Sequence, residues 1–375
     1  MNPLLQLIKY GQSYWLDNLT RDMIHNGDLK ARVTSNGLRG MTSNPAIFHK
    51  AITGSAEYDD QIAQLMKEGH TTEAIYEQLV VRDVQEACDV MRSVYNASDG
   101  ADGFVSLEVS PSLAYDTDGT MNEARRLWSA VDRPNLMIKI PGTPAGVPAI
   151  EQMIYEGRNI NVTLLFSIAD YEAVAWAYIR GLERRVAEGQ SVRHVSSVAS
   201  FFLSRIDVLV DQLLSHRILS QESANYDPRP ADLLGKVALG NAKLAYQAFK
   251  AILRSDRWQA LEAQGAQVQR QLWASTSTKN PEYSDVYYVE PLIGPHTVNT
   301  MTDDTIEAFA DHGRLVENAV EAGIDEAEQV LKDLNAVGID LDKVTWQLQH
   351  EGVQKFIEPF TSLMQALEKK RSTVG

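Results

Sequence analysis

The chain has 375 residues, of which 44% are hydrophobic and 23% charged, a globular composition that excludes a disordered chain. At about 150 residues per domain, this length fits two or three domains, or one barrel-sized domain with additions. The formal net charge of -15 argues against a nonspecific nucleic-acid-binding or membrane-binding surface, so an anionic ligand needs a local basic pocket. The single cysteine, Cys88, excludes an internal disulfide framework and favours a reducing compartment, for which the cytoplasm is the default expectation.

Patterns that bind metals, nucleotide cofactors or membranes are missing from the sequence. No apolar run approaches the roughly 20 residues that cross a bilayer, and the first residues lack the pattern of a signal peptide. The eight histidines are scattered, without a His-Glu-x-x-His motif or a close pair. Glycine-rich dinucleotide and phosphate motifs are absent as well. We therefore expect no metal, no cofactor, no membrane partner and no nucleic-acid partner.

Short apolar runs alternate with amphipathic stretches of helical spacing, such as Thr72–Tyr95 and Tyr171–Glu188. This alternation is typical of βα units around a parallel sheet. The runs with strand character are Ser13–Leu19, Leu38–Asn44, Gly103–Val109, Asn135–Pro141, Asn161–Ser167, Val195–Phe202, Gln271–Ser275 and Val286–Pro291. Since eight strands close a TIM barrel, we predict an α/β fold of the (β/α)8 barrel type.

Two long segments lie outside a minimal barrel. Residues 206–270 are predicted to form a helical excursion between the sixth and seventh strands, broken by turn-forming residues at Asn225–Pro230. Residues 303–375 are predicted to form a helical C-terminal tail packed on the barrel. No change of composition marks a second domain, so residues 1–375 are predicted to be a single domain. The outer helix faces are ordinary, and we make no prediction of oligomeric state.

Polar residues interrupt strands that should be almost entirely apolar, because parallel barrel strands are covered on both faces. Lys139 interrupts the fourth strand and Glu108 the third. Strand alternation puts Ser106, Glu108 and Ser110 on one face of the third strand, and Asn161, Thr163, Leu165 and Ser167 on one face of the fifth. Asp17, Asn44 and Ser200 lie near the ends of their strands. We expect them to point into the barrel and toward its carboxyl-terminal mouth, where barrel enzymes place their chemistry.

Two interpretations of Lys139 and Glu108 are open from the residues alone. One is a structural ion pair in the barrel core. In the other, burial favours the neutral amine of a lysine, which is then nucleophilic and forms Schiff bases with carbonyl compounds. The surrounding polar residues exceed what neutralising one charge requires, which favours the catalytic interpretation.

At these positions the chain resembles the transaldolase family. The segment Thr42-Ser-Asn44-Pro45 resembles the family's Thr-x-Asn-Pro signature, and Asn135–Pro141 resembles its Schiff-base lysine strand. The segment Asn161–Ser167 is similar to its Asn-x-Thr-Leu-x-Phe-Ser strand. The resemblance, closest to the longer bacterial chains, runs in order from about Asp17 to Pro291.

The resemblance implies a cofactor-free transfer of a dihydroxyacetone unit in the pentose phosphate pathway. The donor would be sedoheptulose 7-phosphate and the acceptor glyceraldehyde 3-phosphate, giving erythrose 4-phosphate and fructose 6-phosphate. Lys139 would form the Schiff base, and Asp17 would exchange the proton of the C4 hydroxyl. Glu108 and Thr163 would shuttle protons through an ordered water, while Asn44 and Asn161 would hold sugar hydroxyls.

The segments expected to bind phosphate match the family's pattern less completely than the strands above. Ser200, Phe202 and Arg205 match the family's segment that ends in a phosphate-binding arginine, although Arg205 can also be read as a surface helix cap. On the seventh strand many members have Ala-Ser-Phe-Arg, whereas this chain has Ala-Ser-Thr-Ser-Thr-Lys. Ser275 and Lys279 are the candidates there, with Lys279 alternatively a solvated loop residue.

Three functions are therefore compared. The first is the Schiff-base transferase acting on small sugar phosphates. The second is a fructose 6-phosphate aldolase-like lyase that releases free dihydroxyacetone; family aldolases usually differ at the positions of Glu108 and Phe202, so the retained residues favour transfer. The third is a catalytically silent sugar-phosphate binding protein.

Overall fold

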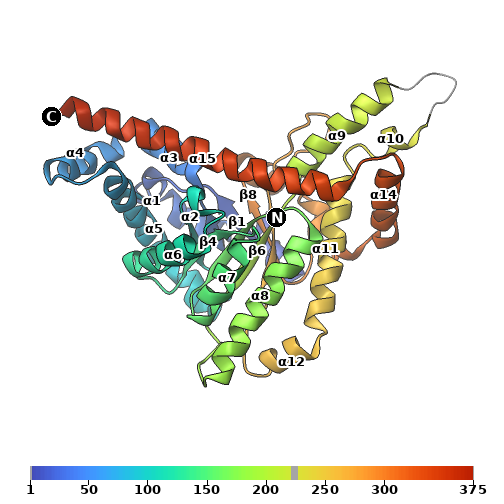
Figure 1. The fold of residues 1–375 in the computed structure, drawn as a ribbon, viewed down its shortest axis with the longest axis horizontal. Helices are drawn as coiled ribbons and strands as arrows, with labels where there is room; N and C mark the ends of the chain where they lie inside the picture. The colour runs from blue at the N-terminus through green and yellow to red at the C-terminus, as the bar shows by residue number, and fades with distance from the viewer. Residues whose placement is uncertain (1, 221–226, 375) are drawn as a thin grey trace.

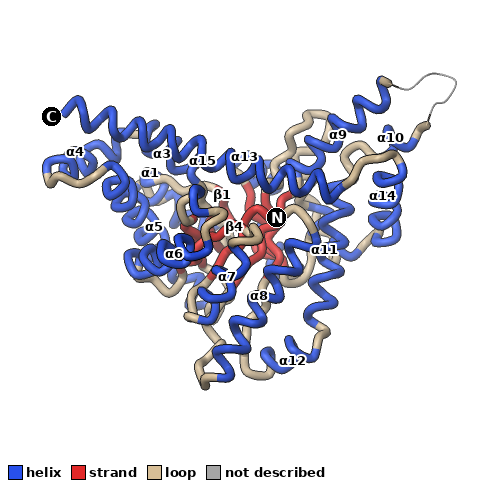
Figure 2. Tube along the Cα trace, in the orientation of Figure 1, coloured by secondary structure: helices blue, strands red, loops and turns tan. Residues whose placement is uncertain are grey.

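The computed structural model describes residues 2–220 and 227–374. In this part of the chain, eight parallel strands close into a barrel in which each strand pairs with the next and β1 pairs with β8. The strands are β1 (Gln12–Asp17), β2 (Gly40–Thr42), β3 (Phe104–Glu108), β4 (Leu136–Pro141), β5 (Ile160–Leu165), β6 (Ser197–Phe202), β7 (Arg270–Ala274) and β8 (Thr297–Met301). Figure 2 shows these strands at the centre with the helices around them, which confirms the predicted barrel.

The helices occupy the connections and the end of the chain (Figure 1). The α-helices are α1 (Arg21–His25), α2 (Asp28–Ser35), α3 (Pro45–Gly54), α4 (Asp59–Lys67), α5 (Thr72–Ala97), α6 (Thr117–Val131), α7 (Gly146–Tyr155), α8 (Ile168–Ala187), α9 (Ser204–Leu219), α10 (Arg229–Asp232), α11 (Val237–Leu253), α12 (Asp256–Glu262), α13 (Asp303–His312), α14 (Ile324–Ala336) and α15 (Leu341–Val374). The 3-10 helices are η1 (Pro3–Tyr10), η2 (Ala56–Tyr58), η3 (Pro111–Leu113), η5 (Glu290–Leu292) and η6 (Ala319–Glu321). The first part of the turn expected at Asn225–Pro230 lies outside the described residues.

The prediction of the eighth strand at Val286–Pro291 was wrong. That segment forms turns and leads into η5, and the strand that closes the barrel is Thr297–Met301. The segment 286–291 is apolar because it packs inside the protein as a loop, where the Tyr288 hydroxyl donates to Asp207. The real strand was missed because threonine and asparagine occupy most of its positions, although every residue in it is buried.

The amino-terminal end of the barrel is closed by a buried carboxylate. Asp102, just before β3, accepts hydrogen bonds from Ser13 at 2.6 Å, Arg39 at 2.7 Å and Arg270 at 2.9 Å. The indole of Trp15 donates to the same carboxylate at 3.2 Å. Although burial opposes ionisation, Arg270 and Arg39 lower the pKa of Asp102 below its ordinary value. Because these contacts of Asp102 fill the amino-terminal end, a ligand can enter only at the opposite, carboxyl-terminal mouth.

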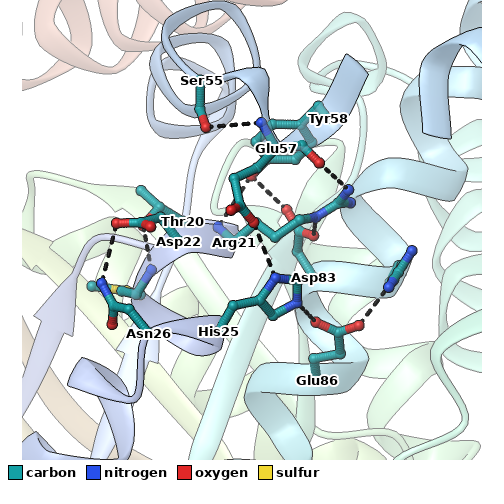
Figure 3. A network of polar contacts seen from close by, with 12 residues as sticks. Thr20, Arg21, Asp22, His25, Asn26, Ser55, Glu57, Tyr58, Asp83 and Glu86 are labelled. Carbon is teal, nitrogen blue, oxygen red and sulfur yellow. Dashed lines mark hydrogen bonds and ion pairs between the residues drawn. The ribbon is translucent and has the colours of Figure 1, made fainter. Parts of the chain in front are cut away.

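A second buried cluster ties the segment after β1 to helix α5 (Figure 3). Arg21 donates to Asp83 at 2.8 Å, and the Tyr58 hydroxyl donates to the other oxygen of Asp83 at 2.7 Å. The Arg21 and Asp83 side chains are 2% and 0% exposed. Nearer the surface, His25 contacts Glu86 at 2.9 Å. These contacts hold the loop after β1 in place, and β1 ends in a predicted site residue.

Helix α15 passes along the carboxyl-terminal side of the barrel, where Figure 1 shows it in red. It packs against α3, α5, η3 and α9. The side-chain amide of Gln349 donates to the backbone carbonyls of Gly142 and Leu164, both at 3.2 Å. Because Gly142 and Leu164 lie at the ends of β4 and β5, this contact joins the helix directly to the barrel mouth.

None of the helices in the described ranges has the length and apolar character needed to cross a membrane.

Candidate active site

A cavity of about 230 Å³ lies at the carboxyl-terminal mouth of the barrel. Its walls come from the ends of the strands and from the segments that follow them, as expected for a barrel enzyme. The predicted site residues that line it are Asp17, Asn44, Lys139, Thr163, Ser200, Phe202, Arg205, Ser275 and Lys279. The structure thus brings together side chains from β1, β4, β5 and β6, from the segments after β2 and β7, and from the first turn of α9.

Lys139 lies on the wall of this cavity and is 5% exposed. Its Nζ donates to the backbone carbonyl of Ser43 at 3.0 Å and lies 3.1 Å from Oε2 of Glu108. Glu108 and Lys139 are register partners on β3 and β4, so strand pairing itself brings the two groups together. The ion pair of the structural interpretation is therefore present, but the amine also faces an open space large enough for a small ligand.

The carboxyl group of Glu108 is suited to exchange a proton with this amine. Neither of its oxygens accepts a hydrogen bond from residues 2–220 or 227–374. Burial raises the pKa of Glu108, an effect that the charge of Lys139 partly offsets. Glu108 does not line the cavity that contains Lys139; it lines a neighbouring cavity of about 330 Å³. The ion pair therefore forms part of the wall between two cavities.

Asp17 is held at the end of β1 by its neighbours on the barrel wall. Thr42, its register partner on β2, donates to Asp17 Oδ1 at 2.7 Å and contacts the Thr300 hydroxyl at 2.7 Å. Burial raises the pKa of Asp17, while the charge of Lys139 and the Thr42 hydrogen bond oppose this effect. A carboxyl group in such surroundings is suited to take and return a proton.

The amide of Asn161 lies behind the cavity wall. Its Nδ2 donates to Ser106 at 3.0 Å, and its Oδ1 accepts a hydrogen bond from Ser200 at 2.7 Å. Asn161 is absent from the lining, whereas Ser200 belongs to it. Asn44, in contrast, lines the cavity; its Oδ1 caps helix α3 by accepting from Ile47, which leaves its amide NH2 group for a ligand.

The expectation that Leu165 and Ser167 share a face with Asn161 was wrong. The register of β5 against β6 shifts between Val162 and Leu165, and Leu164 has a φ of 59°. A bulge of this kind reverses the alternation, so Leu165 lies beside Val162 near Gly142, and Ser167 instead caps helix α8. Thr163 is therefore the last inward residue of the strand. Its hydroxyl is buried and has no hydrogen-bond partner in the described ranges.

Cationic groups gather at the other side of the cavity. Arg205, in the first turn of α9, has its guanidinium carbon 5.2 Å from the ring centroid of Phe202. Burial lowers the pKa of Arg205, while the charges of Asp17 and Glu108 oppose this effect. The interpretation of Arg205 as a surface cap was wrong, because the side chain lines the cavity and its Nη1 is buried without a hydrogen-bond partner among the described residues.

The segment after β7 brings a second cation to the cavity. Ser275 has a φ of 55°, and its hydroxyl contacts that of Ser204 at 2.9 Å. Lys279 is exposed, and its Nζ donates to the Ser277 hydroxyl at 2.6 Å. Both Ser277 and Lys279 belong to the cavity lining. Lys279 thus reaches the same cavity as Arg205 from a separate loop.

The sequence analysis missed several lining residues. Thr42 and Thr300 are polar strand residues. Alternation along β2, where Thr42 lies two residues before Asn44, would have found the first, and a correctly placed eighth strand would have found the second. Phe356 carried no such signal, because it belongs to α15 and reaches the cavity only through the packing of that helix. Its ring centroid lies 5.4 Å from Nζ of Lys139.

Within the described ranges, no group of three or more His, Cys, Asp or Glu side chains is arranged to hold a metal ion.

Comparisons with known proteins agree with this arrangement of residues. A family profile described as Transaldolase/Fructose-6-phosphate aldolase matches residues 14–367. The chain is 52% identical over 373 residues to Transaldolase 2 of Nostoc sp. (strain PCC 7120), covering 99% of this chain and 98% of the relative. It is 51% identical to the transaldolase of Trichodesmium erythraeum, with 98% and 97% covered, and 48% identical to that of Thiobacillus denitrificans, with 97% and 99% covered. The chain therefore belongs to the transaldolase/fructose-6-phosphate aldolase family.

Proposed function

We propose that this protein is a transaldolase that transfers a dihydroxyacetone unit through a Schiff base on Lys139. The donor is sedoheptulose 7-phosphate and the acceptor glyceraldehyde 3-phosphate, and the products are erythrose 4-phosphate and fructose 6-phosphate. The observation that carries the proposal is the buried Nζ of Lys139, which faces a cavity and lies 3.1 Å from the Glu108 carboxyl group. Asp17 lines the same cavity, and the relatives named transaldolase support the same reaction.

The first step is formation of the Schiff base. Glu108 takes a proton from Nζ of Lys139, and the amine adds to the C2 ketone of the donor. The resulting carbinolamine loses its hydroxyl as water, with the proton supplied through Glu108 and a water molecule held by the unpartnered hydroxyl of Thr163. The product is a protonated imine. Its positive charge is balanced by Glu108, which is ionised again.

The second step breaks the bond between C3 and C4. Asp17 takes the proton of the C4 hydroxyl, the aldehyde leaves, and the bonding electron pair moves toward the protonated imine to give an enamine. The imine itself is the electron sink, so the proposal contains no cofactor. When the acceptor aldehyde is attacked, Asp17 returns the proton to the new hydroxyl, and hydrolysis of the imine releases the product.

Substrate orientation follows from the lining of the cavity. Arg205 and Lys279, with the hydroxyl of Ser275, form a cationic end that suits a sugar phosphate. Asn44 and Ser200 present an amide and a hydroxyl to the sugar between the phosphate and the imine. Asn161 acts on the sugar through Ser200, whose hydroxyl it orients. These contacts hold the C4 hydroxyl near Asp17.

The wider assignments belong to the same proposal. The reaction is placed in the pentose phosphate pathway, and the buried free thiol of Cys88 supports a reducing compartment such as the cytoplasm. Residues 1–375 are proposed to be one domain, with segments 206–270 and 303–375 as additions to the barrel. In support, α11 packs against α8 and α9, and α15 packs against α3 and α5.

Chemical trapping tests the proposal. Borohydride reduction in the presence of fructose 6-phosphate should add a stable mass to the peptide that contains Lys139, and Lys139→Ala should abolish both trapping and transfer. An unmodified Lys139 peptide, under conditions where binding of the sugar phosphate is demonstrated, would favour a silent binding protein. A coupled assay with the donor alone separates the remaining alternative, because sustained turnover without an acceptor aldehyde is the behaviour of an aldolase.

A further inference from the structure

Helix α15 brings an aromatic ring to the roof of the cavity. Phe356 is 5% exposed, and its ring centroid lies 5.4 Å from Nζ of Lys139 and 6.0 Å from the guanidinium carbon of Arg205. Together with Phe202, whose ring centroid lies 5.2 Å from the same guanidinium carbon, it places apolar surface against Lys139 and Arg205. None of the steps proposed above uses Phe356.

The position of Phe356 is set by close contacts between α15 and the end of β5. Gln349 donates to the carbonyl of Leu164, the left-handed residue that follows Thr163. Gly352 packs so tightly against this residue that a Cβ atom there would lie 2.8 Å from Leu164 Cδ2. Phe356 follows Gly352 by four residues and therefore lies on the same face of the helix. The β5 bulge thus provides the surface on which the helix is seated.

We propose that Phe356 is a specificity-determining residue that keeps water away from the enamine formed on Lys139 and so favours transfer over release of dihydroxyacetone. The inference rests on the proposed Schiff-base function. An aromatic face attracts the cationic imine, and an apolar roof excludes the water that would carry a proton to the enamine carbon. The acceptor aldehyde enters from the phosphate-binding side, which Arg205 and Lys279 line.

Release competes with transfer through a defined sequence of steps. After the first aldehyde leaves, a water molecule gives a proton to the enamine carbon and takes the proton that Asp17 holds, which gives the protonated imine of dihydroxyacetone. Water then adds to the imine carbon, and its proton passes to Glu108. Glu108 passes this proton to the nitrogen and takes the proton of the carbinolamine hydroxyl as the carbon–nitrogen bond breaks, so the amine of Lys139 is restored and free dihydroxyacetone departs. Both branches end in hydrolysis of an imine and consume one water molecule there, so they part at the enamine. Shielding the enamine carbon from water slows its protonation without slowing its attack on an aldehyde.

The test measures the ratio of free dihydroxyacetone to transferred product, with fructose 6-phosphate as donor and erythrose 4-phosphate as acceptor at a fixed concentration. We expect Phe356→Ala to raise this ratio by about tenfold, and Phe356→Leu, which keeps an apolar side chain, to raise it by a smaller factor. The matched control is Phe360→Ala, one turn further along α15. The Phe360 ring packs edge-on against Tyr76 at 5.3 Å, so its loss removes aromatic packing from the same helix without opening the roof over Lys139.

The outcomes separate this inference from the proposed function. If the wild-type protein shows neither trapping nor transfer, the proposed function itself fails. If the wild-type protein transfers and the ratio in Phe356→Ala is unchanged, the role of Phe356 is wrong. An equal rise in Phe360→Ala also overturns it, because the effect then comes from loosening α15. If Phe356→Ala does not fold, Phe356→Leu decides the question, and an unchanged ratio in that variant overturns the inference.

Discussion

Glu108 and Lys139 face each other as register partners on β3 and β4, with Oε2 of the glutamate 3.1 Å from Nζ of the lysine. The amine is open to one cavity and the carboxyl group lines another. In the proposed mechanism the two groups exchange a proton while the substrate occupies only the cavity that contains Lys139. The predictions below follow from this arrangement and from the buried charges around it.

Replacing Glu108 by glutamine should slow Schiff-base formation by a factor of about 100 to 10,000, because the amide cannot accept the proton of Nζ. The measurement is the rate of borohydride-dependent mass addition at Lys139 with fructose 6-phosphate. Glu123→Gln is the matched control, since Glu123 is also a shielded glutamate but accepts its hydrogen bond from the Ser110 backbone. Trapping of the Glu108→Gln variant at the wild-type rate would contradict the proton-transfer role.

Replacing Asp17 by alanine should leave imine formation intact and block cleavage of the C3–C4 bond. The C4 hydroxyl then lacks its base, and loss of such a group typically slows a reaction by about 100- to 10,000-fold. Borohydride trapping and aldehyde release are measured on the same sample. If the Asp17→Ala variant is trapped as well as the wild type and also turns over normally, the role proposed for Asp17 is wrong.

Removal of Arg205 and removal of Lys279 should weaken phosphate binding to different degrees. Arg205 is largely shielded from water, so Arg205→Ala should raise KM for fructose 6-phosphate roughly 10- to 100-fold. Lys279 is exposed, and Lys279→Ala should raise it by less than about fivefold. Fructose without phosphate serves as the control donor. An equal loss of activity toward fructose in Arg205→Ala would show that the arginine does not act on phosphate.

Asp207 should make the protein less stable as the pH rises from 4 toward 8. Burial raises the pKa of Asp207 from 3.8 to about 7, so the folded protein retains its proton more strongly than the unfolded chain does. The associated stability is complete below pH 3.8 and is lost as the pH passes through about 7; its upper bound is on the order of 4 kcal/mol. Urea unfolding of wild type and Asp207→Asn across this range tests the sign. The stability of the wild type should fall relative to that of Asp207→Asn as the pH rises, and parallel curves would rule out the effect.

The buried pair of Arg21 and Asp83 should contribute strongly to stability. Asp83→Ala leaves the Arg21 guanidinium buried without its counter-charge, which should lower the free energy of unfolding by about 3 to 5 kcal/mol. Glu86→Ala, in the more exposed contact with His25, should cost less than about 1 kcal/mol. Urea unfolding measures both. Equal effects of the two substitutions would contradict the importance of burial.

Most of the candidate site was predictable because its residues belong to strands, whose alternating pattern is visible in the sequence. Lys139, Glu108 and Asp17 are charged residues within or at the end of otherwise apolar runs, and alternation along a strand decides which way each side chain points. The register that sets Glu108 opposite Lys139 also follows from two regular neighbouring strands. For these residues the local pattern was sufficient.

The wrong predictions concern segments whose local sequence pattern does not indicate how they pack in the folded protein. A buried loop at 286–291 has the composition of a strand, and the strand at Thr297–Met301 does not. The bulge at Leu164 reverses the inward and outward alternation of side chains in β5, and no glycine or proline in the strand indicates it. Both cases depend on which surface each segment meets in the folded protein.

The sequence by itself determined the barrel class and the residues that can perform chemistry, since strand period and side-chain type are properties of neighbouring positions. Only the tertiary structure decided that Glu108 and Lys139 face separate cavities, that Arg205 points inward and that Phe356 covers the lysine. These relationships join segments far apart in the chain. They arise from the packing of α9 and α15 on the barrel mouth, which no local pattern encodes.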